Sequence, residues 1–214
     1  MDASVTVAAV RDVGPDTVAI EFETPDGFEA EPGQFVKLGA ELDGESYARF
    51  YTLSSPSVTE TFEVTVGIDP DEAGPFSKHL ESLEAGDELT LTGPFGDSYY
   101  AADERVVVLA GGPGVGPAVG IAEAAIADAN EAAVVYIDDA PAHEERLNAL
   151  SDNGASVVIA DDDSALTDAV SDALTGADGE QVFVYGFASF VEAAIEALEA
   201  AGGDADAAKV ENFG

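Results

Sequence analysis

The chain of 214 residues contains no cysteine, only two histidines, and only seven lysines and arginines. Without cysteine it can form no disulfide, no thiolate zinc site and no cysteine-ligated iron–sulfur cluster, and it has no cysteine nucleophile. Two histidines leave few side chains for a metal site, so none is expected. The scarcity of cations excludes nucleic-acid binding through a basic surface and disfavours docking on anionic lipid.

Targeting and membrane signals are also missing from the sequence. The first residues, MDASVTVAAVRD, lack the basic-then-apolar pattern of a signal peptide. No apolar run approaches the roughly 20 residues that are needed to cross a bilayer. We therefore expect a cytoplasmic protein without a membrane span.

Acidic residues are abundant instead, because 44 Asp and Glu side chains give the chain a formal net charge of −37. High net charge is typical of disorder when hydrophobicity is low. Here 46% of the residues are hydrophobic and they fall in regular runs, so the chain is expected to fold. The composition resembles that of salt-in halophilic proteins, whose carboxylate surfaces keep them soluble at high ionic strength.

The first half of the chain has the alternating apolar pattern of short, half-buried strands. Strands are expected at Val5–Val10, Thr17–Glu23, Phe35–Leu38, Phe50–Ser54, Phe62–Ile68 and Glu88–Thr92. One short helix is expected at about Phe76–Leu83. Many short strands separated by turn residues favour a small antiparallel barrel or sandwich.

After Asp103 the pattern changes to apolar runs that alternate with helical segments. Buried strands are expected at Val106–Ala110, Val134–Ile137, Val157–Ala160 and Val182–Tyr185. Helices are expected after the first strand, near Ala142–Leu150, near Ala165–Leu174, and after Ser189, which forms a capping box with Glu192. This alternation predicts a doubly wound parallel sheet. Two domains, residues 1–102 and 103–214, are therefore expected.

Two segments of the first half carry groups that suit an anionic ligand. Arg49 and Tyr51 share a parity on one strand, so they lie on the same face, and an arginine fork pairs well with phosphate. The loop at Gly74 opens a short helix with Ser77 near its N-cap and Lys78 beside it, where free N–H groups can bind an anion. A strand with a surface arginine and an ordinary capped helix would have the same patterns.

Two segments of the second half follow buried strands, where ligands of parallel sheets bind. Leu109–Ala118 is glycine-rich and lies between a strand and a helix, so its backbone could approach a pyrophosphate, although it is not a strict G-x-G-x-x-G motif. Tyr185–Phe190 ends another strand. A tight turn without a ligand and a pair of core aromatic residues are the corresponding structural alternatives.

Together these segments resemble, in order and over nearly the whole chain, the ferredoxin–NADP reductase superfamily of flavoproteins. The resemblance implies an N-terminal antiparallel β-barrel that binds FAD, followed by an α/β doubly wound parallel sheet that binds a nicotinamide dinucleotide. It implies that Arg49 pairs with the FAD pyrophosphate, that Tyr51 packs on the flavin, and that the Thr52 hydroxyl lies near the reactive nitrogen.

The same resemblance implies further cofactor contacts and two candidate catalytic residues, Thr52 and Phe213, which would lie nearest the flavin ring. The implied FAD contacts besides Arg49, Tyr51 and Thr52 are Ser55, Gly74, Phe76, Ser77, Lys78 and Phe213. The implied contacts of the nicotinamide dinucleotide are Gly111, Gly112, Gly114, Val115, Gly116, Tyr185, Gly186 and Phe187. The chain departs from the family in having Pro113 where threonine is usual and Tyr185-Gly186-Phe187 where Cys-Gly-Pro is usual.

The implied function is an FAD-dependent oxidoreductase that passes hydride from NAD(P)H to flavin. Because the chain has no iron–sulfur ligands of its own, an external acceptor is expected: a ferredoxin, a haem protein or a small quinone-like molecule. One alternative is a non-catalytic flavin- or nucleotide-binding regulatory module, which the two departures would suit. A second is a flavin reductase that uses free flavin as a substrate.

The acidic strand ends predict a preference for NADH over NADPH. Asp138, Asp139 and the run Asp161–Asp163 follow the second and third strands of the parallel sheet. Carboxylates there would repel a 2′-phosphate and suit a free ribose hydroxyl, although acidic clusters in such a chain can equally be solvated surface. We expect a higher kcat/KM with NADH in steady-state assays; an equal or higher value with NADPH would contradict this.

Overall fold

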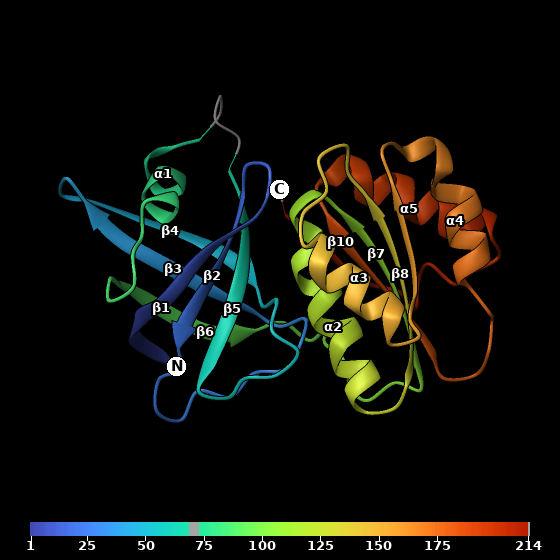
Figure 1. Cartoon of the computed structure of the whole chain (residues 1–214), viewed down its shortest axis with the longest axis horizontal. Coiled ribbons are helices and arrows are strands. Elements are labelled where there is room, and N and C mark those ends of the chain that lie inside the picture. The colour runs from blue at the N-terminus through green and yellow to red at the C-terminus, as the bar shows by residue number, and fades with distance from the viewer. Residues whose placement is uncertain (69–72, 214) are drawn as a thin grey trace.

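The computed structural model describes residues 1–68 and 73–213, which form two β-sheets that lie side by side (Figure 1). The first sheet is antiparallel, with the strand order β4-β3-β6-β1-β2-β5. Its strands are β1 (Asp2–Gly14), β2 (Thr17–Glu23), β3 (Phe35–Leu42), β4 (Glu45–Thr52), β5 (Thr61–Gly67) and β6 (Glu88–Phe95). The alternation of apolar residues places one face of each strand in a common core, which includes the packed rings of Phe22 and Phe62.

The two edges of this sheet, β4 and β5, meet at one end. Leu53 forms a bridge with Val64, and the Ser54 N–H donates to the Glu63 carbonyl oxygen at 2.8 Å. The bridge closes the sheet into a barrel, which removes an exposed edge. Helix α1 (Pro75–Glu81) covers the barrel core with Phe76 and Leu80.

The second sheet is entirely parallel, with the order β11-β10-β7-β8-β9. Its strands are β7 (Arg105–Gly111), β8 (Glu131–Ile137), β9 (Ser156–Ala160), β10 (Glu180–Gly186) and β11 (Lys209–Asn212). Helices α2 (Val115–Ala127) and α3 (Glu144–Asp152) cover the face turned toward the barrel, and α4 (Leu166–Ala173) and α5 (Ala188–Ala200) cover the other face (Figure 1). The expected fold class, an antiparallel barrel followed by a doubly wound parallel sheet, is confirmed.

One local expectation, the capping box at the start of α5, is wrong. The N-cap of α5 is Phe187, with no capping hydrogen bond from a side chain, so Ser189 and Glu192 do not form a capping box. The chain leaves β10 in an extended conformation at Phe187 and enters the helix directly, which places Ser189 inside the first turn. The N-cap of α1 is Gly74, and Ser77 lies near it, in the first turn of that helix.

The chain beyond residue 208 forms a fifth strand that its polar composition did not predict. In β11, Val210 and Glu211 lie opposite Val184 and Tyr185 of β10. The pairing places the C-terminal segment at the edge of the parallel sheet. Among residues 1–68 and 73–213, no helix is long and apolar enough to cross a membrane.

Candidate functional site

The candidate site lies where the end of β4 meets the carboxyl ends of the parallel strands. The Thr52 hydroxyl donates to a carboxylate oxygen of Glu211 at 2.9 Å, across 159 positions of sequence. Thr52 is only 6% exposed, and Glu211 lies on β11 beside Tyr185. This hydrogen bond joins the strand of Arg49 and Tyr51 to the second sheet.

Glu211 is the titratable group at the centre of this contact. Burial raises its pKa to about 7, while the hydrogen bond from Thr52 opposes the rise by stabilising the ionised form. Because the folded pKa lies above the ordinary value, ionisation of Glu211 lowers folding stability as pH rises from about 4.5 to about 7. Near neutral pH the side chain can therefore take up or release a proton.

Arg49 and Tyr51 lie on one face of β4, as their parity predicts. Burial raises the pKa of Tyr51 to about 12, and the nearby Arg49 guanidinium opposes the rise, which places the two groups close together. The Tyr51 ring packs against the barrel core. Arg49 is exposed, and its guanidinium donates a hydrogen bond to the neighbouring Ala48 carbonyl oxygen at 2.9 Å.

The Arg49 guanidinium is free to hold an anion. Four of the seven cations are used in ion pairs, namely Arg11, Arg105, Arg146 and Lys209. Arg49, Lys37 and Lys78 form no ion pair with any residue of 1–68 or 73–213. An unpaired arginine in so acidic a chain is a ready partner for a phosphate.

The predicted site residues at the start of α1 are partly exposed and partly buried. Gly74 and Lys78 are exposed, and a Cβ at Gly74 would meet nothing within 4 Å. Ser77 is half-buried. Phe76 is 3% exposed and packs in the barrel core, so its side chain supports the helix rather than facing outward.

The glycine-rich loop runs over the carboxyl end of β7, and most of its glycines are required by packing. A Cβ at Gly111 would lie 2.4 Å from the Phe190 ring, and one at Gly114 would lie 2.2 Å from the Tyr185 carbonyl oxygen. A Cβ at Gly116 would lie 2.6 Å from Thr65 of the barrel. Gly112 differs, because its φ is +55° and its surroundings are open. Its backbone is therefore the accessible part of the loop.

The aromatic residues of the predicted site separate into a buried and an exposed group. Tyr185 is fully buried, its hydroxyl donates to the Ser98 carbonyl oxygen at 3.1 Å, and burial together with Glu211 raises its pKa. Phe187 is 51% exposed and packs edge to face on Phe213, with ring centroids 6.3 Å apart. The Phe213 N–H donates to the Gly186 carbonyl oxygen at 2.9 Å, which fixes Phe213 beside the end of β10.

Other predicted residues have structural partners. Val115 is fully buried in the core beneath α2. Ser55 is 8% exposed, and its hydroxyl accepts the Glu63 N–H at 2.6 Å. Asp138 follows β8 and accepts from the Tyr136 hydroxyl and the Ala140 N–H, both at 2.9 Å, which orients its carboxylate at the carboxyl edge of the sheet.

Glu211 is the residue that reasoning from sequence missed as a site group. The sequence places it in an acidic and aromatic C-terminal segment, but nothing local indicates that it pairs with Thr52. An acidic side chain in a polar terminal segment is usually solvated, and only the pairing of β11 with β10 brings Glu211 to the end of β4.

Comparisons with known proteins agree with this geometry. Residues 4–100 match the family model described as "Oxidoreductase FAD-binding domain". The glycine betaine monooxygenase reductase subunit of Chromohalobacter salexigens is 49% identical over 92 residues, which are 41% of this chain and 24% of that protein. The chain thus spans about a quarter of the length of that relative.

Two solved structures share the fold over the whole chain. The Amycolatopsis cytochrome P450 reductase superposes with a TM-score of 0.82 at 25% identity, covering 100% of this chain and 70% of that one. A ferredoxin NADP+ reductase from Neisseria gonorrhoeae with bound FAD and NADP superposes with a TM-score of 0.81 at 18% identity, covering 100% of this chain and 99% of that one.

The hydrogen bond from Thr52 predicts how the pKa of Glu211 responds to mutation. A hydrogen bond to an ionised group contributes about 1.5–3 kcal/mol, and about 1.4 kcal/mol corresponds to one pKa unit. Thr52→Val should therefore raise the pKa of Glu211 from about 7 to roughly 8 or above. The measurement is a ¹³C NMR titration of glutamate carboxyl groups, with Glu211→Gln to assign the signal. Thr52→Ser keeps the hydroxyl and should leave the titration unchanged; an equal shift in both variants would contradict the role of the hydrogen bond.

Proposed function

We propose that this chain oxidises NADH on a bound FAD and passes the electrons to an external acceptor, because residues 4–100 match the model of an oxidoreductase FAD-binding domain and the whole chain shares its fold with a ferredoxin NADP+ reductase. FAD, when bound, accepts hydride as a two-electron unit and releases electrons one at a time. The proposal includes a cytoplasmic location, where NADH is available.

The barrel residues would hold FAD. Arg49, which has no ion pair among residues 1–68 and 73–213, would supply a guanidinium for the pyrophosphate, and the exposed Gly74 and Lys78 would supply a second contact for phosphate oxygens. Tyr51 offers a ring that is braced by the barrel core, and Thr52 offers a hydroxyl at the end of the same strand. The residues present therefore fit the group in charge and in the chemistry of their side chains.

The parallel sheet would hold the nicotinamide dinucleotide. The open backbone at Gly112 lies over the end of β7, where pyrophosphates approach the helix that follows. Asp138 has a carboxylate suited to a ribose hydroxyl, which supports the preference for NADH. The exposed Phe187 and the half-buried Phe213 form an aromatic pair beside the ends of β10 and β11.

The observation that carries this proposal is the hydrogen bond between Thr52 and Glu211. It brings the strand with the phosphate-binding arginine to the carboxyl edge of the sheet that would carry the dinucleotide. Hydride transfer requires the two cofactors to be held at van der Waals contact, and such positioning is a large part of catalysis. Glu211, with its pKa of about 7, could hold or release the proton that accompanies flavin reduction.

Electrons would leave through an apolar patch formed by Phe35, Phe50 and Phe95. The three rings pack with centroid distances of 5.5–6.0 Å, and Phe50 and Phe95 are 59% and 38% exposed. Phe50 lies between Arg49 and Tyr51 on β4, so the patch backs the strand that would hold the flavin. Exposed apolar patches of this kind mark contact surfaces for partner proteins.

Phe50→Ser should lower the rate of reduction of a protein acceptor several-fold, because the contact would lose its largest exposed ring. The measurement compares NADH-dependent reduction of cytochrome c with that of ferricyanide, which is too small to need a docking surface. Ile159→Ser, at an exposed apolar residue of β9, is the matched control. Equal loss with both acceptors would contradict a docking role.

The proposal is tested by the visible spectrum of the desalted protein before and after addition of NADH without oxygen. A flavin band that survives desalting and bleaches with NADH is expected. Arg49→Ala should lose the band on desalting, because the pyrophosphate loses its cation. A bound flavin that persists under excess NADH and NADPH would favour a regulatory module, and a wild type that loses flavin but turns over added flavin would favour a flavin reductase.

A further inference from the structure

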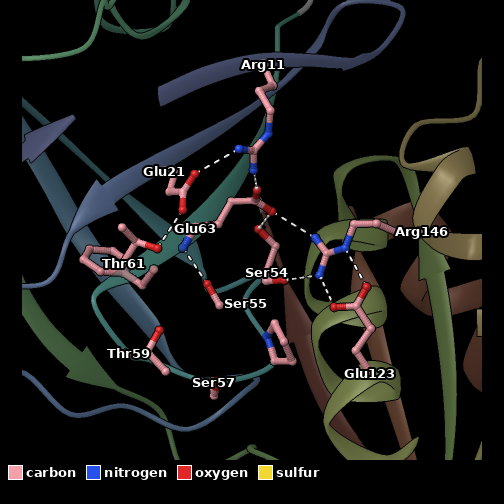
Figure 2. Close-up of a pocket in the computed structure, with 12 residues that line it drawn as sticks. Arg11, Glu21, Ser54, Ser55, Ser57, Thr59, Thr61, Glu63, Glu123 and Arg146 are labelled. Carbon is pink, nitrogen blue, oxygen red and sulfur yellow. Dashed lines mark hydrogen bonds and ion pairs between the residues drawn. The ribbon is translucent and has the colours of Figure 1, made fainter. Parts of the chain in front are cut away.

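Arg146 ties the two domains together from a position outside the site described above. Its guanidinium, on α3, binds both carboxylate oxygens of Glu123 on α2, with Nε–Oε1 and Nη2–Oε2 distances of 2.8 and 2.7 Å (Figure 2). It also reaches into the barrel, donating to Glu63 at 2.9 Å and to the Ser54 carbonyl oxygen at 2.7 Å. The Arg146 side chain therefore connects helices α2 and α3, which face the barrel, to β5 and to the residues that follow β4, where the barrel closes.

The barrel side of this contact is itself held firmly. Glu63 is 9% exposed, and its carboxylate accepts from the Ser54 hydroxyl at 3.1 Å and pairs with Arg11 of β1 at 2.5 Å, besides the bond from Arg146 (Figure 2). A buried carboxylate without such donors would be strongly unfavourable. Glu63 therefore gives Arg146 a fixed partner rather than a flexible surface group.

The Ser54 peptide is also the point against which α2 is packed. A Cβ at Gly120 would lie 2.9 Å from the Ser54 carbonyl oxygen, and one at Gly116 would lie 2.6 Å from Thr65 of β5. Helix α2 begins directly after the glycine-rich loop, and Ser54 follows Thr52 by two residues. Arg146 thus stabilises the contact between Ser54 and α2. This contact lies between the glycine-rich loop, which would bind the dinucleotide, and the end of β4, which would bind the flavin.

A second contact supports the same junction. The backbone N–H of His143 donates to the Val13 carbonyl oxygen at 2.7 Å. The Nε2 atom of the His143 ring lies 2.8 Å from the Thr65 hydroxyl oxygen. Burial, with the charges of Arg146 and Arg11, lowers the pKa of His143 to about 3, so the ring stays neutral at physiological pH. The His143 ring therefore stays neutral over the pH range in which Glu211 titrates.

We propose that Arg146 is a positioning residue for hydride transfer, which sets the separation of the two cofactors by clamping Ser54 and Glu63 of the barrel to Glu123 of α2. This inference rests on the proposed function. It assigns to Arg146 no contact with either cofactor. Because a misplacement of about 1 Å can cost roughly 100-fold in rate, a clamp at this point would matter even at a distance from the reacting atoms.

The test measures the rate at which NADH bleaches the flavin of the holoenzyme in anaerobic stopped-flow experiments. Arg146→Met should slow bleaching roughly 10- to 100-fold, while the FAD retained after desalting and the NADH concentration at half-maximal rate change little. Arg146→Lys, which keeps the charge but not the planar fork, should recover part of the rate.

Arg105→Met is the matched control. Arg105 also makes two ion pairs and one carbonyl hydrogen bond, to Glu180 at 2.9 Å, Glu131 at 2.7 Å and Ala173 at 2.8 Å, all within the second domain. Arg105→Met should lower thermal stability without slowing the bleaching.

Gly120→Ala is a second variant of the same contact. It keeps Arg146 but forces a methyl group against Ser54, so it should slow the bleaching. It keeps the proposal testable if Arg146→Met does not fold.

The outcomes are distinguishable. A wild type that NADH bleaches, with Arg146→Met and Gly120→Ala bleaching at the same rate, overturns the positioning role and leaves the proposed function standing. Equal slowing by Arg105→Met also overturns it, because the effect would then be one of stability. A wild type with bound flavin that NADH does not bleach overturns the proposed function and the role of Arg146 with it.

Discussion

The arrangement of this molecule depends on the packing of the barrel's closing edge against the first helix of the parallel domain. The bridge between Leu53 and Val64 closes the barrel, and it leaves Ser54 turned toward α2. Only glycine fits at position 120 of that helix, because any side chain would collide with the Ser54 peptide. Main-chain contact therefore limits how closely the end of β4, which carries Thr52, approaches the start of α2, and Arg146 clamps the two together at this contact.

The few cations of the chain are distributed according to this arrangement. Arg11 and Arg146 lie at the junction of the domains, and Arg105 and Lys209 hold the second domain and its C-terminal strand. Arg49, on the barrel, has no ionic partner among the described residues. The chain has 44 acidic side chains against seven lysines and arginines, and Arg49 has no ionic partner among the described residues although carboxylates are abundant. Its isolation therefore suits an anionic ligand rather than a structural role.

Burial controls the chemistry of the site more strongly than hydrogen bonding does. The hydroxyl of Thr52 stabilises ionised Glu211, yet desolvation outweighs this and raises the pKa of Glu211 to about 7. The same environment keeps Tyr185 neutral, and its hydroxyl is engaged by the Ser98 carbonyl oxygen. The Tyr185 ring, at the position where the family resemblance expects a cysteine, thus fills the space between the parallel sheet and Ser98, and the adjacent exposed ring is that of Phe187, which packs on the half-buried Phe213.

The sequence by itself determined that the fold contains an antiparallel and a parallel sheet, and it determined the segments that carry the candidate site. Alternating apolar residues define the barrel strands, and continuous apolar runs define the parallel strands, because each pattern reflects how many faces of a strand are buried. The shared face of Arg49 and Tyr51 follows from strand geometry alone. Only the tertiary structure decided that Glu211 meets Thr52, that Phe76, Val115 and Ser55 serve packing, and that Arg146 joins the domains. These contacts connect residues up to 159 positions apart, and no local propensity specifies which solvated-looking side chain will be buried against which distant strand.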